Sequence, residues 1–475
     1  MNTKPRTKRR RRDSANRRRA RSQGDLPHNP RHSSRTRTNE ARSHEIAEQR
    51  DQSKKSPGRP RGAFGTLIPK LQRAISDEGY SDPTKIQTEC IPPILDGNDV
   101  IGSAQTGTGK TAAFALPLLQ QLSFETRRPR DRTPRALILA PTRELAAQIG
   151  DSLASYGRFL HLTHTVIFGG VNQYRQVKAM HRGVDVLVAT PGRLLDLINQ
   201  GHIQLDHVEI FVLDEVDRML DMGFIPDIER IRGLLPDERQ TLFFSATMNA
   251  KMETLARSMV HNPVRIAIEP EAPAVERIEQ AVLFVHQKQK DKLLLELLEA
   301  TEGGKVILFT QMKHQANRVA ERLDQAGIRS VAIHGNKSQA ARTRALKGFK
   351  QNRFRVLVAT DVAARGLDVD DITQVINYDL PVESETYIHR IGRTGRAGMD
   401  GQSWSFCTAE DRSLLHSIEK LLGRSVPVVL DHPYHSEEAS RSKLPAPKNF
   451  GRQQNRGHRR PGKFRGPRRH KRSRH

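Results

Sequence analysis

The chain has 475 residues and a formal net charge of +26, with 79 Lys and Arg against 53 Asp and Glu. No apolar run approaches the ~18 residues that a membrane-spanning helix requires, and the only cysteines are Cys90 and Cys407. We therefore expect two or three globular domains without a membrane span, a disulfide framework or a Cys-based zinc site. The first residues are basic without a following apolar segment, which argues against a secretory signal and favours a cytoplasmic location.

The positive charge lies at the two ends of the chain. Residues 1–62 carry a net charge of +14 and residues 436–475 carry +12, while the residues between them are neutral overall. Because both ends are poor in apolar residues, we expect disordered basic tails over 1–62 and 433–475. Their arginine clusters favour contact with nucleic-acid phosphates. Solubilising tails and a nuclear-localisation signal are the alternatives.

The neutral body alternates short β-branched runs with helical patterns. Strands are predicted at 99–103, 135–140, 164–168, 184–189, 208–213 and 241–245, and after an interruption at 281–285, 305–309, 330–334, 354–359, 374–378 and 403–407. Apolar strands separated by helices are typical of parallel sheets covered on both faces. The sequence thus predicts two α/β domains, over 63–268 and 278–432, joined by a Pro-rich linker at 269–277.

A phosphate-binding loop is predicted between the first strand and the helix that follows it. Its sequence nearly matches the GxxxxGK(S/T) pattern, with Ala104 in place of the first glycine. Two glycines let the backbone amides approach phosphate oxygens, Lys110 can neutralise phosphate charge, and the Thr111 hydroxyl can hold Mg²⁺. We expect ATP and Mg²⁺ as ligands. The loop residues are Ala104, Gln105, Thr106, Gly107, Thr108, Gly109, Lys110 and Thr111.

An acidic pair follows the strand predicted at 208–213. Asp214 and Glu215 should lie at the carboxyl end of the sheet, where open α/β folds bind ligands. Asp214 suits a Mg²⁺-linked role, through water, and Glu215 suits the polarising of an attacking water. Helix capping is the alternative role for such acids.

These motifs, with others in the same order, resemble DEAD-box ATP-dependent RNA helicases of superfamily 2, of the compact bacterial RhlE-like type with basic tails. The resemblance covers about residues 64–422 and implies two tandem RecA-like domains. It also implies that Gln87 reads adenine, that Phe64 stacks on the base, and that Asp368 contacts the ribose. Ser245 and Thr247 resemble the motif that couples hydrolysis to strand separation. Arg393 and Arg396 resemble arginine fingers, worth ~10³–10⁵ in rate.

The resemblance further implies contacts to the RNA backbone, with weak sequence specificity. These residues are Pro141, Thr142, Arg143, Gly170, Thr190, Pro191, Gly192, Arg193, Gln339, Arg342 and Thr360. Val216 stands where the family has Ala, giving DEVD, and we expect tighter packing there rather than lost chemistry.

The expected activity is RNA-stimulated ATP hydrolysis with local, non-processive melting of short duplexes and remodelling of ribonucleoproteins. The expected partner is RNA, with ribosomal precursors among the possible targets, and the expected state is a monomer. An ATP-gated RNA clamp or annealing chaperone acting through the tails is the alternative. A DNA-translocating helicase of the same superfamily is a weaker one.

Overall fold

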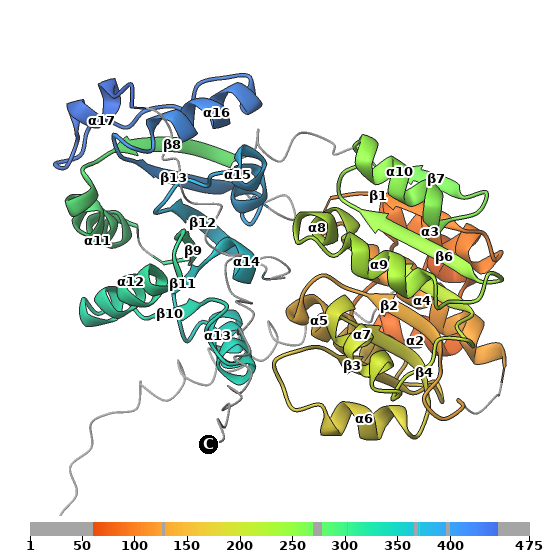
Figure 1. Ribbon diagram of the computed structural model, residues 1–475. Coiled ribbons are helices and arrows are strands. Elements are labelled where there is room, and N and C mark those ends of the chain that lie inside the picture. Colours follow the sequence, from red (N-terminus) through yellow and green to blue (C-terminus); the bar gives the residue numbers. More distant parts are fainter. Residues whose placement is uncertain are drawn as a thin grey trace, which may run out of the picture. The chain divides into compact units, whose positions relative to one another are not determined.

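Figure 1 shows the computed structural model of the chain. It describes residues 60–444, except for residues 106, 126–128, 269–277, 302, 365–368, 370 and 396–399. Most of both predicted tails and the predicted linker lie outside the described residues. Among the described residues, no helix is both long and apolar enough to cross a bilayer.

The first sheet has seven strands in the order β3-β4-β2-β5-β6-β1-β7, and every pairing in it is parallel. Its strands are β1 (Val100–Ser103), β2 (Pro134–Leu139), β3 (His164–Ile167), β4 (Val184–Ala189), β5 (Ile210–Leu213), β6 (Gln240–Ser245) and β7 (Val264–Ala267). The six strands predicted for this domain are confirmed. Strand β7 was missed, and it is an edge strand with three exposed residues of four, so it lacks an apolar run.

Helices cover both faces of this sheet, as Figure 1 shows. One face packs against α2 (Pro69–Asp77), α3 (Lys85–Leu95), α4 (Lys110–Phe124) and α5 (Arg143–Tyr156), after the short 3₁₀ helix η1 (Gly62–Thr66). The other packs against α6 (Tyr174–Met180), α7 (Pro191–Asn199), α8 (Val216–Asp221), α9 (Ile225–Arg232) and α10 (Ala250–Met259). Alternate residues of β2 supply the two cores: Ala136 and Ile138 face the first, and Leu137 and Leu139 the second. An apolar run therefore forms a strand buried on both sides.

The second sheet has six strands in the order β10-β11-β9-β12-β13-β8, again all parallel. They are β8 (Ile278–Phe284), β9 (Lys305–Phe309), β10 (Ser330–Ile333), β11 (Val356–Ala359), β12 (Ile372–Asn377) and β13 (Gly401–Cys407). The helices are η2 (Gln287–Gln289), α11 (Lys290–Ala300), α12 (Lys313–Gln325), α13 (Gln339–Lys350), α14 (Asp361–Ala364), α15 (Ser384–Ile391), α16 (Arg412–Leu422) and α17 (Glu437–Arg441). Two parallel-sheet domains with helices on both faces confirm the predicted fold class.

The start of the predicted C-terminal tail is folded. Val285 forms an antiparallel bridge with His435, and Ala439 of α17 is 1% exposed within the core of the second domain. The prediction of a disordered tail from residue 433 is therefore wrong for residues 433–444. These residues are mostly polar, and tertiary contacts fix them, both with the end of β8 and with Ala409 and Arg412 near the start of α16.

Candidate functional site

The predicted site residues of the first domain lie along one edge of its sheet, in two neighbouring halves that have different predicted ligands. Apart from Phe64 and Gln87, which precede β1, those predicted to bind nucleotide or to couple hydrolysis lie at or after the ends of β1, β5 and β6, which are neighbours in the sheet. Those predicted to bind RNA follow β2, β3 and β4, also neighbours, and β2 lies beside β5. The Asp214 amide donates to the Leu139 carbonyl at 3.0 Å, which links the two halves directly.

The phosphate loop is held by its own lysine. Gly107 and Gly109 have φ values of 89° and 93°, in the left-handed region that glycine adopts most easily. Lys110 begins α4, is 6% exposed, and donates from Nζ to the Ala104 carbonyl at 2.6 Å. Bound phosphates would offer this ammonium a stronger, charged partner. Thr106 lies outside the described residues.

Gln87, the predicted adenine reader, is fixed against this loop. Its Oε1 accepts from the Thr84 amide at 2.9 Å, and its Nε2 donates to the Gly109 carbonyl at 3.1 Å. The Thr84 hydroxyl donates to the Thr108 carbonyl at 2.8 Å. Sequence reasoning missed Thr84, although a Thr three residues before a Gln is the capping-box pattern.

Phe64 does not offer a free ring for stacking. It is 1% exposed and belongs to the core cluster that also contains residues of α3 and α4. The predicted contact with adenine would require the ring to be uncovered first.

Asp214 is a buried carboxylate beside the phosphate loop. It is 2% exposed, and its Oδ1 makes no hydrogen bond with any described residue. Burial, reinforced by the neighbouring Glu215, raises its pKa from 3.8 to about 7, while Lys110 acts in the opposite direction. Such an unsatisfied anion fits a cation, or a water bound to one, so Asp214 and the half-buried Thr111 suit Mg²⁺ bound with ATP.

Glu215 is held in an unusual backbone conformation. Its φ of 54° is left-handed, which is uncommon for a residue with a side chain, and it caps α8. Its carboxylate pairs with Arg218, and the two side chains are 9% and 10% exposed. Sequence reasoning missed Arg218, although its position three residues on from Glu215 places it on the same side of the helix. Val216, between them in sequence, is fully buried in the core.

Asp217 joins the acidic segment to the segment after β6. Its Oδ2 accepts from the amides of Ala246 and Thr247, at 3.0 and 3.2 Å. Within the latter segment, the Ser245 hydroxyl donates to the Thr247 carbonyl at 2.7 Å. Direct hydrogen bonds therefore connect the two segments.

The predicted RNA-binding residues of the first domain lie at the starts of helices and in one glycine turn. Pro141 precedes Thr142, the N-cap of α5, and Arg143 is its first residue. Thr190 caps α7, whose first residues are Pro191, Gly192 and Arg193.

Gly170 has a φ of 77°, and a Cβ there would overlap the Arg143 guanidinium. Burial lowers the pKa of Arg143, as do the cations Arg342 and Arg193, against the opposing effect of Glu144. Clustered guanidinium groups at helix N-termini are suited to bind phosphates.

Gln339 and Arg342 lie on α13 of the second domain, and both contact Glu144. Gln339 Nε2 donates to Glu144 Oε1 at 2.9 Å, and Arg342 pairs with Glu144 Oε2 at 2.9 Å. Thr360 follows β11 and is 6% exposed. Sequence reasoning missed Glu144, because its partners are nearly two hundred residues away in the chain.

Arg393 is one of the two predicted arginine fingers, and it follows an arginine with a structural role. Arg390 is 1% exposed, and its guanidinium donates to Asp361 at 2.6 and 2.8 Å and to the Asp379 carbonyl at 2.6 Å. Arg393 lines a pocket with Asp361, His389 and Arg390. Arg396 and Asp368 lie outside the described residues.

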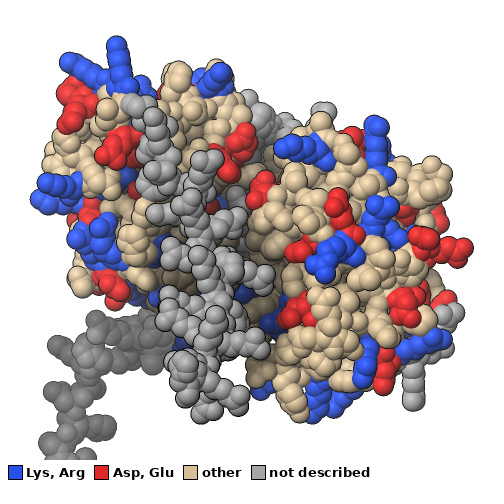
Figure 2. All heavy atoms as spheres, in the orientation of Figure 1, with Lys and Arg blue, Asp and Glu red and all other residues tan. Residues whose placement is uncertain are grey.

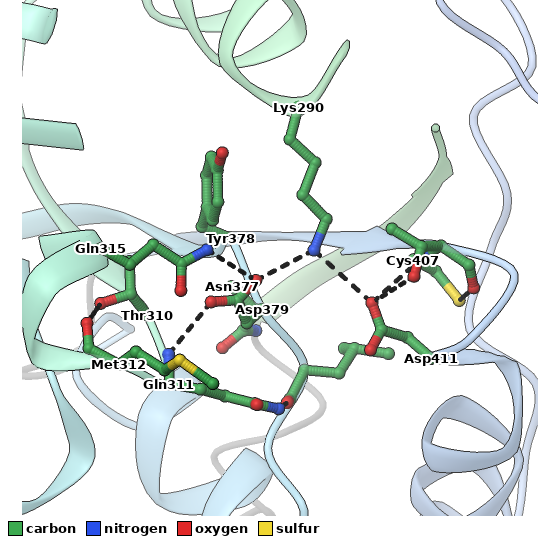
Figure 3. A network of polar contacts seen from close by, with 12 residues as sticks. Lys290, Thr310, Gln311, Met312, Gln315, Asn377, Tyr378, Asp379, Cys407 and Asp411 are labelled. Atoms are coloured by element: carbon green, nitrogen blue, oxygen red, sulfur yellow. Dashed lines mark hydrogen bonds and ion pairs between the residues drawn. The ribbon is translucent and has the colours of Figure 1, made fainter. Parts of the chain in front are cut away.

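Figure 3 shows the buried network that holds this end of the second sheet. Lys290 of α11 is 1% exposed and pairs with Asp379 at 3.0 Å and with Asp411 at 3.5 Å. Asp379 also accepts from the Gln311 amide at 3.0 Å, and Asp411 accepts from the Thr408 hydroxyl at 2.8 Å. One ammonium thus ties together the segments that follow β9, β12 and β13.

Comparisons with known proteins agree with this geometry. Residues 84–255 match the family model described as DEAD/DEAH box helicase, and residues 289–398 match the helicase conserved C-terminal domain. The chain is 41% identical to DEAD-box ATP-dependent RNA helicase CshA of Geobacillus kaustophilus, over 78% of this chain and 79% of the relative. It is 44% identical to ATP-dependent RNA helicase RhlB of Pseudomonas syringae pv. tomato, over 76% and 92%.

Among solved structures, the chain is similar to S. cerevisiae Dbp5 bound to RNA and ADP BeF3. The TM-score is 0.66 and the identity 33%, with 77% of this chain and 94% of that one covered. The RhlE-like subtype stays a prediction. The chain belongs to the family of DEAD-box ATP-dependent RNA helicases and is an RNA-stimulated ATPase.

Proposed function

We propose that this enzyme melts short RNA duplexes locally, by binding one strand in a shape that its complement cannot follow, without travelling along the RNA. The observation that carries the proposal is the shared sheet edge. The nucleotide residues follow β1, β5 and β6, the RNA residues follow β2, β3 and β4, and the Asp214 amide bonds to the carbonyl of Leu139. Occupation of one half can therefore bias the other, which is a reciprocal coupling between ATP and RNA.

The hydrolytic step is assigned to residues of both domains. Lys110, which donates to the Ala104 carbonyl, would bind the phosphates of ATP, and Asp214 with its unpartnered Oδ1 would hold Mg²⁺. When bound, Mg²⁺ supplies the charge neutralisation that phosphoryl transfer requires. Glu215, held by Arg218, orients the attacking water, and Arg393 and Arg396 stabilise the developing charge. The bonds that Asp217 accepts from Ala246 and Thr247 carry the resulting displacement to the segment that follows β6.

The RNA-binding residues are suited to backbone contacts. Threonine hydroxyls, helix N-termini and guanidinium groups bind phosphate and sugar, which gives little sequence specificity. We propose that contacts to the 2′-hydroxyl favour RNA over DNA. Stimulation of ATP hydrolysis by RNA, compared with single-stranded DNA of the same sequence, tests this preference. Equal stimulation by both would contradict it.

The decisive experiment measures strand separation against duplex length. We expect ATP-dependent separation of short duplexes and a steep fall in rate as the duplex is lengthened. Glu215→Gln should retain ATP binding and lose turnover. Separation of long duplexes at an undiminished rate would refute local melting, and unchanged turnover in Glu215→Gln would refute the role of Glu215.

A clamp or annealing chaperone is the second candidate, favoured by the concentration of the +26 charge in the two ends of the chain. Because residues 433–444 pack on the second domain, the deletion that tests it should remove 1–59 and 445–475 only. A shortened protein that still melts short duplexes supports the helicase. If the shortened protein loses only RNA annealing, annealing is a second activity that belongs to the two basic ends of the chain.

We further propose that the enzyme is a cytoplasmic monomer whose RNA targets include ribosomal precursors or other ribonucleoproteins. Crosslinking and sequencing of the RNA bound in cells would identify the targets, and sedimentation would establish the oligomeric state.

A further inference from the structure

Helix α6 (Tyr174–Met180) presents a basic and aromatic face to solvent. Residues of a helix are rotated by about 100° from one to the next, so residues 174, 175 and 178 lie on one side of α6. Residues 181 and 182 follow the end of the helix and continue its last turn, since their amides donate to the Val177 and Ala179 carbonyls at 3.0 and 3.1 Å. The ring of Tyr174 is 69% exposed, a high value for an aromatic side chain. The members of this α6 face, all exposed, are Tyr174, Arg175, Lys178, His181 and Arg182.

The opposite side of α6 is anchored to the predicted RNA-binding residues. Gln176 is 7% exposed, donates from Nε2 to the Phe168 carbonyl at 3.1 Å, and accepts from Arg193 Nη1 at 3.3 Å. Gln173 Nε2 donates to Gln200 Oε1 at 2.7 Å, which fastens the start of α6 to the end of α7. The α6 face is therefore held in a fixed position beside Arg193 and the glycine turn.

The segment that carries this face has charge of one sign. No Asp or Glu occurs from Gly169 to Val184, whereas Arg175, Lys178 and Arg182 contribute three positive charges. The body between the basic ends of the chain is neutral overall, so this is a local concentration of positive charge. Figure 2 shows Lys and Arg side chains at the lower edge of the first domain, where Figure 1 places α6.

We propose that the α6 face binds single-stranded RNA that continues beyond the strand held at the ends of β2, β3 and β4. Tyr174 stacks on a base, and Arg175, Lys178 and Arg182 contact the phosphates that flank it. Aromatic rings beside cations are the combination by which proteins bind single strands without sequence preference. The inference rests on the proposed function, because it extends the same RNA site.

The test measures the affinity of the full-length protein for a series of single-stranded RNAs from about 6 to about 20 nucleotides. This range spans known sizes of single-strand binding sites. Tyr174→Ala should weaken binding of the long RNAs about fivefold or more, as expected for one lost stacking contact, while Tyr174→Phe should bind like the wild type. The triple variant Arg175→Gln/Lys178→Gln/Arg182→Gln should lower the salt dependence of log affinity for long RNAs by about 2, from three contacts. The charge-matched control is Lys70→Gln/Arg230→Gln/Arg232→Gln, whose residues are exposed on α2 and α9.

The length dependence separates this inference from the proposed function. The shortest RNAs should bind the variants and stimulate their ATP hydrolysis as in the wild type, and thermal unfolding should be unchanged. Equal affinities of variants and wild type for long RNAs would overturn the inference and leave the helicase assignment intact. A loss of equal size on short and long RNAs would also overturn it, because the effect would then arise at Arg193. A loss matched by the control triple would show general electrostatic attraction and would overturn it as well.

Discussion

Substituting Asp214 by Asn should stabilise the protein free of nucleotide while abolishing its activity. The unfolded chain ionises this carboxyl near 3.8, whereas the folded chain ionises it only near 7, because the site is buried and Glu215 is adjacent. Between these values the folded protein binds more protons than the unfolded one, so its free energy of unfolding falls as the pH rises. The difference corresponds to at most about 4 kcal/mol above neutral pH.

The assay is thermal unfolding of wild type and Asp214→Asn without nucleotide, in the presence of a chelator. If half of that limit is realised, a gain of about 2 kcal/mol raises the midpoint by about 4–8 °C at about pH 8. At about pH 5 the folded side chain is protonated but the unfolded one is still ionised, so the gain should fall to less than half of its value at about pH 8, and it should vanish only below about pH 4. Asp185→Asn is the matched control. Asp185 is 3% exposed and accepts from the Thr163 amide at 2.7 Å and hydroxyl at 2.9 Å, with Arg135 at 3.8 Å, so its substitution should destabilise. A gain in Asp214→Asn that does not depend on pH, or a loss at about pH 8, would refute the reasoning.

Three further predictions concern other parts of the site. Arg218→Met should lower kcat about tenfold or more while ATP affinity is retained, since it releases Glu215, the group that orients water. Arg230→Met on α9 is the control. An unchanged kcat in Arg218→Met would rule out a positioning role for Arg218. Gly170→Ala should weaken RNA binding but not ATP binding, because its Cβ overlaps Arg143. The control is Gly97→Ala, which has a φ of 83° and open space around it, so it carries the same backbone strain of about 1–2 kcal/mol without that overlap. Equal RNA affinities of the two variants would contradict the role of Arg143. Lys290→Met should lower the free energy of unfolding of the second domain by about 3–5 kcal/mol, since the buried Asp379 and the partly buried Asp411 lose their partner. Denaturant unfolding measures this against the exposed Lys292→Met, and similar values for both would show that the network adds no stability.

The sequence is sufficient for the sheet architecture and for most groups at the strand ends. Apolar runs such as 135–140 are buried on both faces, so their composition alone marks them as parallel strands. Glycines with positive φ mark the phosphate loop, because few other residues fit there. The acidic pair could be placed because it directly follows a predicted strand.

Long-range partners could not be predicted in the same way. Lys290 lies 89 residues from Asp379 and 121 from Asp411 in the chain, and no local pattern connects them. Phe64 was expected at the base because of its place in a motif, but its burial depends on how α3 and α4 pack. The fold of residues 433–444 likewise depends on contacts with the end of β8 and with Val285, which their polar composition does not predict.

The network around Lys290 predicts which functions are lost when one of its members is substituted. The Asp379 carbonyl accepts from Arg390, three residues before the predicted arginine finger Arg393. The Thr310 amide, next to Gln311, donates to the carbonyl of Ala359, which precedes the predicted RNA contact Thr360. Damage at any member should therefore impair phosphate chemistry and RNA handling together. Screens that sort alleles into binding-deficient and turnover-deficient classes should find those at Lys290, Asp379 and Asp411 in both classes at once.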